Sequence, residues 1–209
     1  GIYLTGQQRS ISYAISFDSG KSAQEIPESG FSVIPLSIDS DTAEYAKFYG
    51  LDFFQDILKK TDRTEIEERI LLAVQWFGAA IKEVQPLFAF LKFYVVLDIL
   101  LKKKKENAKP SIPPRVSTLL FPFAPFDSKA VSMVKDLEEL IEERNEVAHS
   151  GIPKDRHIEN LRYWSKWYAI GVINQTRMRI LTENLETQKD LHNWIKEQRI
   201  YIKKLHKLK

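Results

Sequence analysis

The sequence has no cysteine and only four histidines among its 209 residues. The absence of cysteine excludes a disulfide framework, a thiol nucleophile and any zinc or iron–sulfur site with cysteine ligands. No two histidines stand three or four residues apart, so the usual spacing of a zinc-binding helix is missing as well. The sequence therefore predicts no metal and no other cofactor.

A long hydrophobic run is also missing. The longest apolar stretch, residues 87–101, is interrupted by Lys92 and Asp98 and is shorter than the ~20 residues that span a bilayer. The chain does not open with a basic segment followed by an apolar one, as a secretory signal does. We expect no membrane partner and a cytoplasmic location. Because the chain begins at Gly1, we also expect a longer protein with an upstream sensor domain or a partner protein.

Basic and acidic residues nearly balance over most of the chain, and the excess of basic residues is concentrated at its end. The net charge is +3, while residues 187–209 alone hold seven basic and two acidic side chains. Hydrophobic residues make up 44% of the chain, which is enough for a core. Two basic segments are predicted to attract a polyanion such as a nucleic-acid backbone, with solvated helix ends as the alternative. They contain Lys102, Lys103, Lys104 and Lys105, and Lys203 and Lys204.

Hydrophobic periodicity divides the chain into a β-rich beginning and a helical remainder. Residues 1–40 contain two runs of β-branched and aromatic residues, 9–17 and 31–38, which predict a short strand pair or the end of an upstream β domain. From residue 41 the period is 3.6, and the fold class is mainly α. We expect a linking helix in 41–61, a helical bundle over 62–185 and a basic helix in 186–209.

Helix boundaries in the bundle follow from caps and prolines. Asp62 or Thr64 is expected to cap a helix whose core-facing stripe runs from Ile66 to Val84. The nearly all-apolar segment 87–101 predicts a central helix. A basic connection over 102–114 should lead to a short helix at 115–120, opened by Pro113–Pro114. Asp127 or Ser128 should begin the next helix, which the segment 150–153 ends, and two long helices follow.

The segment RNEVAHSG, residues 144–151, carries the most chemical information. Arginine can grip phosphate oxygens in a bidentate manner, and histidine can transfer protons near neutral pH. Asn145 and His149 share one helix face, whereas Arg144 lies about 140° from His149. All three line one groove only if the last turn opens or a second copy supplies the missing side. The alternative is structural, with Arg144 paired to a surface carboxylate and His149 capping the helix.

Four blocks in order resemble the Apea-like group of the HEPN superfamily. They are ERILLAVQWFGAAIKE, FLKFYVVLDILL, PRVSTLL and LIEERNEVAHSG, and the last holds an arginine–polar–x–x–x–histidine motif. The resemblance covers roughly residues 62–185. In that group the helix of the second block often carries a glutamate where this chain has Asp98.

The resemblance implies an all-helical HEPN-type bundle, usually a homodimer, with metal-independent endoribonuclease activity in anti-phage defence or toxin systems. By position, Arg144 and His149 would be the catalytic pair and Asn145 the orienting residue. RNA would be cut by attack of its 2′-hydroxyl, leaving a 2′,3′-cyclic phosphate. The alternative is a non-catalytic HEPN module that dimerises or binds RNA or protein.

Two further features have open interpretations. Asp98 is either a buried carboxylate with its hydrogen-bond partners inside the bundle or a group near the site that contacts Arg115. In the second case Asp98 and Arg115 would be energetically coupled. Trp164, Trp167 and Tyr168 are predicted to pack in the core, with stacking of single-stranded bases as the alternative.

Overall fold

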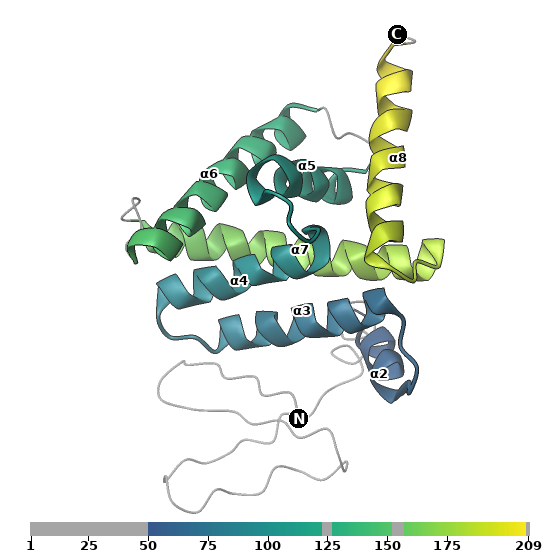
Figure 1. Cartoon of the computed structure of the whole chain (residues 1–209), viewed down its shortest axis with the longest axis horizontal. Coiled ribbons are helices and arrows are strands. Elements are labelled where there is room, and N and C mark those ends of the chain that lie inside the picture. The colour runs from purple at the N-terminus through teal and green to yellow at the C-terminus, as the bar shows by residue number, and fades with distance from the viewer. Residues whose placement is uncertain (1–49, 123–126, 152–156, 208–209) are drawn as a thin grey trace, which may run out of the picture. The chain divides into compact units, whose positions relative to one another are not determined.

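A computed structural model of the chain describes residues 50–122, 127–151 and 157–207. Over these three ranges the backbone forms seven α-helices and no strand (Figure 1). The helices are α2 (Leu51–Lys59), α3 (Glu65–Ile81), α4 (Pro86–Leu101), α5 (Ala108–Leu120), α6 (Ser128–Ser150), α7 (Ile158–Glu183) and α8 (Gln188–Lys207). The predicted mainly helical fold is confirmed. The predicted strand pair in residues 1–40 lies outside the described residues.

Side-chain caps fix the helix ends that the sequence predicted. Thr64 begins α3 with a capping box, in which its hydroxyl accepts from Glu67 N–H and the Glu67 carboxylate accepts from Thr64 N–H. Asp127 caps α6 by accepting from the N–H groups of Lys129 and Ala130. α6 ends at Ser150 because Gly151 adopts a left-handed conformation (φ 73°), which costs glycine little.

The core is built around α4, which packs against α3 on one side and α7 on the other (Figure 1). Its buried side chains cover one broad face of the helix, and the opposite face is half-buried except for the exposed Phe88. The largest buried side chains are Phe90, Phe93, Tyr94, Leu97, Leu100 and Leu101. The predicted central helix is therefore confirmed. The predicted stripe of α3 is wrong at its end, because α3 stops at Ile81 and leaves the Val84 side chain 87% exposed.

α5 is longer than the sequence predicted. The prediction placed a connection over 102–114, but the helix begins at Ala108, after Asn107 accepts a hydrogen bond from Lys109 N–H. Pro113 and Pro114 lie inside it and remove two backbone donors. The helix survives because Ile112 and Val116 are fully buried and α5 packs against α6, α7 and α8. Tertiary packing thus overrides the proline signal.

The last helix belongs to the same folded unit as the bundle, which extends from Asp52 to Lys209. α7 ends at Glu183, because Asn184 adopts a left-handed conformation (φ 51°), and the chain then turns sharply into α8 (Figure 1). α8 buries Leu191 and Ile195 and packs on α5 and α4. None of the described helices is both long and apolar enough to cross a membrane.

Candidate functional site

The C-terminal part of α6 carries the motif that the sequence singled out. Arg144 and Asn145 are half-buried, whereas His149, in the last turn, is exposed. Nη1 of Arg144 donates to Oδ1 of Asn145 over 3.1 Å. The motif thus combines a partly sheltered guanidinium and an accessible imidazole on one helix end. Arg144 and His149 are five residues apart, so they are separated by about 7.5 Å along the helix axis, at 1.5 Å for each residue.

Two residues of α4 hold the Arg144 guanidinium from the other side. Its Nη2 lies 3.7 Å from Oδ2 of Asp98, and its Cζ lies 5.1 Å from the centre of the Tyr94 ring. Tyr94 and Asp98 are four residues apart, so they share one face of α4. Sequence reasoning missed Tyr94. The only signal for it was this spacing from Asp98 within an otherwise apolar helix.

Burial dominates the electrostatics around Asp98. It raises the pKa of the Asp98 carboxyl group, and the positive charges of Lys102 and Arg144 only partly oppose that shift. Burial and the negative charge of Asp98 raise the pKa of the Tyr94 hydroxyl. The Tyr94 hydroxyl lies close enough to Asp98 to lower the pKa of the carboxyl group slightly, although neither Oδ1 of Asp98 nor the Tyr94 hydroxyl oxygen has a partner with full hydrogen-bonding geometry within the described residues. The Asp98 carboxylate therefore has few hydrogen-bond partners. Arg144, on α6, is the counter-charge that another helix brings to it.

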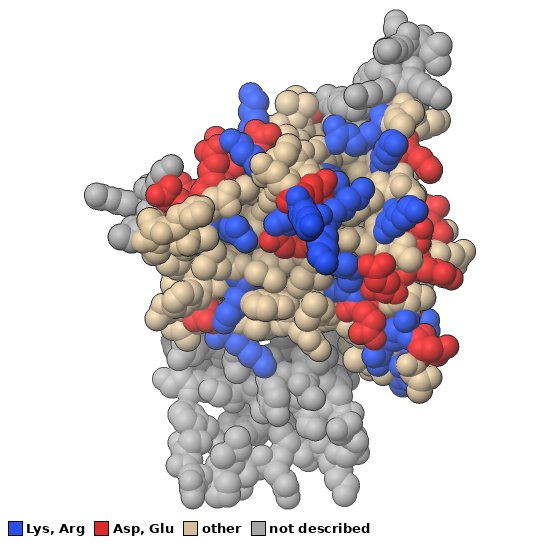
Figure 2. Space-filling model, in the orientation of Figure 1, with Lys and Arg blue, Asp and Glu red and all other residues tan. Residues whose placement is uncertain are grey.

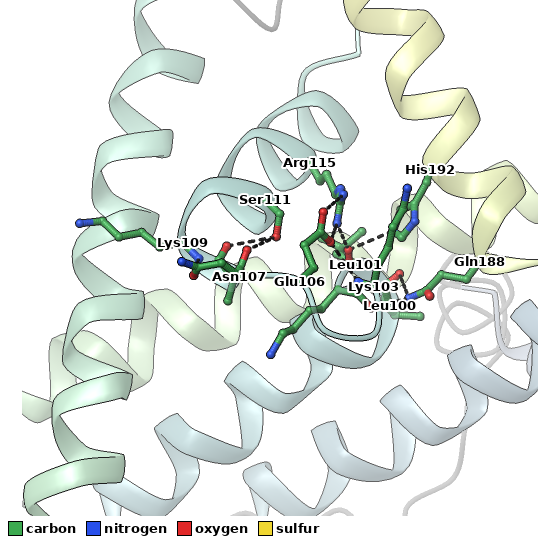
Figure 3. Close-up of polar contacts among 12 residues, drawn as sticks. Leu100, Leu101, Lys103, Glu106, Asn107, Lys109, Ser111, Arg115, Gln188 and His192 are labelled. Atoms are coloured by element: carbon green, nitrogen blue, oxygen red, sulfur yellow. Dashed lines mark hydrogen bonds and ion pairs between the residues drawn. The ribbon is translucent and has the colours of Figure 1, made fainter.

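Arg115, the other residue expected near Asp98, has different partners. Its guanidinium binds the Glu106 carboxylate through two contacts of 2.6 and 2.7 Å, and it donates to the Leu101 carbonyl over 2.6 Å (Figure 3). This bidentate pair lowers the pKa of Glu106 to about 2. The structure therefore pairs Asp98 with Arg144 and Arg115 with Glu106.

A double-mutant cycle tests which arginine Asp98 is coupled to. We expect the unfolding free energies of Asp98→Asn and Arg144→Gln to be non-additive by about 1 kcal/mol, since both side chains are partly exposed and solvent screens the pair. Asp98→Asn and Arg115→Gln should instead be additive within about 0.5 kcal/mol. Urea titrations of the single and double variants measure both quantities. The reverse pattern would favour the contact with Arg115 and contradict the pairing seen here.

The predicted basic segments are placed only in part. Lys103, Lys104 and Lys105 are exposed in the loop between α4 and α5, while Lys102 is half-buried beside Asp98. Lys203 and Lys204 lie in α8, but their side chains are outside the described set. On the face drawn in Figure 2, lysine and arginine side chains gather over the middle of the molecule and along one upper edge.

A cleft that the sequence did not suggest lies between α5 and α8. It encloses about 610 Å³, and its basic lining residues are Lys103, Arg115, Lys196 and Arg199. His192, which is buried, donates from Nε2–H to the Leu101 carbonyl over 2.9 Å at its edge (Figure 3). The two sides of this cleft come from residues 103–115 and 192–200, so no local pattern could have revealed it.

The aromatic residues of α7 are not all in the core. Tyr168 is buried, as predicted, but Trp164 and Trp167 are 50% and 43% exposed, which contradicts the prediction for them. Trp164 and Tyr168 line a second hollow of about 410 Å³. Four carboxylates share its lining: Asp136, Glu139, Glu142 and Glu143. Since these charges repel a polyanion, this hollow is a poor platform for RNA bases.

Within the described ranges, no three histidine, aspartate or glutamate side chains are grouped so that they could hold a metal ion. In comparisons with known proteins, no family model matches the chain, and neither does any curated protein or solved structure.

Proposed function

We propose that this protein is an endoribonuclease of the HEPN type and that Arg144, Asn145 and His149 form its active site. The observation that carries the proposal is the end of α6. There Asn145, Asp98 and Tyr94 hold the Arg144 guanidinium in place, and His149 is exposed one turn further on. The mainly helical fold and the resemblance of residues 62–185 to the Apea-like HEPN group support the same assignment.

A site that cleaves RNA does not have to supply a nucleophile, because the 2′-hydroxyl of the RNA lies next to the phosphate and can attack it. In the proposed reaction the 2′-oxygen forms a bond to phosphorus, and the bond from phosphorus to the 5′-oxygen breaks. A base removes the 2′-hydroxyl proton and an acid protonates the leaving 5′-oxygen. The products are a 2′,3′-cyclic phosphate and a 5′-hydroxyl end, so the proton count balances.

Each residue has a role that suits its surroundings. His149 acts as base or acid, because it is accessible and an imidazole can both accept and donate a proton. Arg144 binds the non-bridging oxygens of the phosphate and stabilises the charge that accumulates there. Asn145, Asp98 and Tyr94 are positioning residues, since they contact the guanidinium and fix its direction. A homodimer would supply a second His149, so that one copy acts as base and the other as acid.

The second candidate function is a non-catalytic HEPN module that dimerises or binds RNA or a protein partner. One observation favours it: Arg144 already has a carboxylate and an aromatic ring as partners within its own chain, which is what a structural arginine requires. Variants of Arg144 or His149 that no longer cleave RNA but still bind it would favour the ribonuclease over the non-catalytic module.

The test is cleavage of an end-labelled single-stranded RNA and of total transfer RNA in EDTA. We expect products with 2′,3′-cyclic phosphate ends, and no cleavage of a DNA strand of the same sequence, which has no 2′-hydroxyl. His149→Ala should slow cleavage by about 100-fold or more, the usual contribution of a general acid or base. Arg144→Lys should also slow it, because lysine keeps the charge but loses the bidentate grip.

His157→Ala is the matched control, because His157 is also exposed but lies at the start of α7. It should cut RNA at the wild-type rate. Circular dichroism and RNA binding of each variant show that loss of cleavage is not loss of folding. A folded His149→Ala variant that cuts as fast as wild type, or a wild-type chain that binds RNA in EDTA without cutting it, would favour the non-catalytic module.

A further inference from the structure

The cleft between α5 and α8 has an unbalanced charge. Of its four basic residues, only Arg115 has a carboxylate partner, Glu106. Lys103, Lys196 and Arg199 have no carboxylate within ion-pair distance among the side chains that the structure describes. Among the described lining residues Glu106 is the only acidic one, so these residues carry three positive charges in excess.

Arg199 is in the least favourable position of the three. Its side chain is half-buried, and both burial and the positive charge of Arg115 lower its pKa. A partly desolvated cation that faces another cation destabilises the fold unless an anion is present. The same positive field reaches His192, where burial and the charges of Arg115 and Lys103 lower the pKa to about 4. Neutral His192 therefore adds no charge to the cleft at pH 7.

The shape and the other lining groups indicate which kind of anion fits the cleft. A volume of about 610 Å³ falls in the range of sites for small organic ligands. Pro110, Pro114 and Ile195 give the wall apolar surface, while Asn107 and Asn193 add amide groups at the rim. A compact ion such as a single phosphate would leave most of this space empty. An organic ligand with several phosphate charges and a less polar body would use both kinds of surface.

We propose that the α5–α8 cleft binds a chain of phosphate groups attached to a nucleoside, held by Lys103, Lys196 and Arg199. Two sources carry this chemistry, a free nucleoside triphosphate and the 5′-triphosphate end of an RNA. The phosphates lie against the three cations, and the nucleoside packs on the proline and isoleucine side chains. This site is separate from the α6 motif, so the inference does not depend on ribonuclease activity.

Binding is measured on the full chain at low salt, in EDTA, with four probes. They are ATP, inorganic triphosphate, and one short RNA prepared with a 5′-triphosphate or with a 5′-hydroxyl. Because every 2′-hydroxyl of the RNA is methylated, it cannot be cleaved, and a failure of binding cannot be confused with ribonuclease activity. Calorimetry serves for the small probes and fluorescence anisotropy for the RNA.

We expect ATP or the 5′-triphosphate RNA to bind with a Kd below about 100 µM. The double variant Lys196→Gln/Arg199→Gln should weaken that binding at least ~10-fold, because two charged contacts are lost. Lys189→Gln, which removes the same charge from α8 outside the cleft, should leave it unchanged. ATP as the tighter probe identifies a free nucleotide as the ligand. A 5′-triphosphate RNA that binds at least ~10-fold more tightly than both ATP and its 5′-hydroxyl form identifies the RNA end.

Three results would overturn the proposal. The first is a folded wild-type chain that binds neither ATP nor the 5′-triphosphate RNA below a Kd of ~1 mM. The second is equal binding of the two RNAs combined with no binding of ATP, which would indicate backbone contacts elsewhere. The third is a double variant that binds as tightly as wild type. Circular dichroism of the double variant shows whether a loss of binding is a loss of folding.

Discussion

Phe93→Ala is expected to lower the free energy of unfolding by about 4 kcal/mol. Phe93 lies on α4 with 1% of its surface exposed, and the centre of its ring is 5.2 Å from that of Phe77 on α3. Truncation removes the buried ring and leaves a cavity between two helices whose backbones cannot close it fully. Since a domain of this size is stable by only about 5–15 kcal/mol, the variant should be at the edge of folding.

Phe88→Ala is the matched control for that measurement. Phe88 stands on the same helix but is 47% exposed, so its truncation should cost less than about 1 kcal/mol. Urea titrations followed by circular dichroism give both values. If the two variants lost similar amounts of stability, α4 would not be the central helix that its burial indicates.

Acidification from pH 7 to pH 4 is expected to cost about 3 kcal/mol of stability through His192 alone. Burial, Arg115 and Lys103 lower the pKa of His192 from its ordinary 6.5 to about 4 in the folded chain. Between these two values the unfolded chain binds a proton at this residue and the folded chain does not. The stability is therefore fully present above pH 6.5 and is lost as the pH falls to 4.

His192→Gln isolates this contribution. Glutamine has no titratable group, yet its amide can still donate a hydrogen bond to the Leu101 carbonyl that His192 contacts. The carboxyl groups titrate alike in both proteins, so the difference between the two stability curves reports His192. We expect the wild-type curve to fall more steeply by about 3 kcal/mol between pH 7 and 4. Parallel curves would show that His192 is exposed to solvent or already charged.

Part of the fold and of the candidate site could be predicted from the sequence because the signals are local. The capping box at Thr64, the cap at Asp127 and the stop at Gly151 act within one helical turn. The same holds for the motif itself, since Arg144 and His149 lie on one helix and their separation along the axis is fixed by helix geometry. Their place at the end of α6 followed directly from these boundaries.

Other features could not be predicted because they depend on which helices meet. The sequence offered Arg115 as a neighbour of Asp98, but the way α4 and α6 lie brings Arg144 to that carboxylate instead. The proline pair of α5 predicted a helix start, and packing on three neighbouring helices extended the helix to Ala108. Trp164 had the spacing of a core residue, yet no described helix covers half of its surface.

The sequence by itself determined that the chain is mainly helical, where α3, α4 and α6 lie, and that an arginine, an asparagine and a histidine stand in the last two turns of α6. Periodicity and capping decide these features, and both act over a few residues. Only the tertiary structure decided that Asp98 and Tyr94 hold Arg144, and that Lys103, Lys196 and Arg199 share one cleft. Asp98 and Tyr94 lie 46 and 50 positions before Arg144, and Lys103 lies 93 and 96 positions before Lys196 and Arg199. Residues so far apart come together only after hydrophobic burial has set how the helices pack.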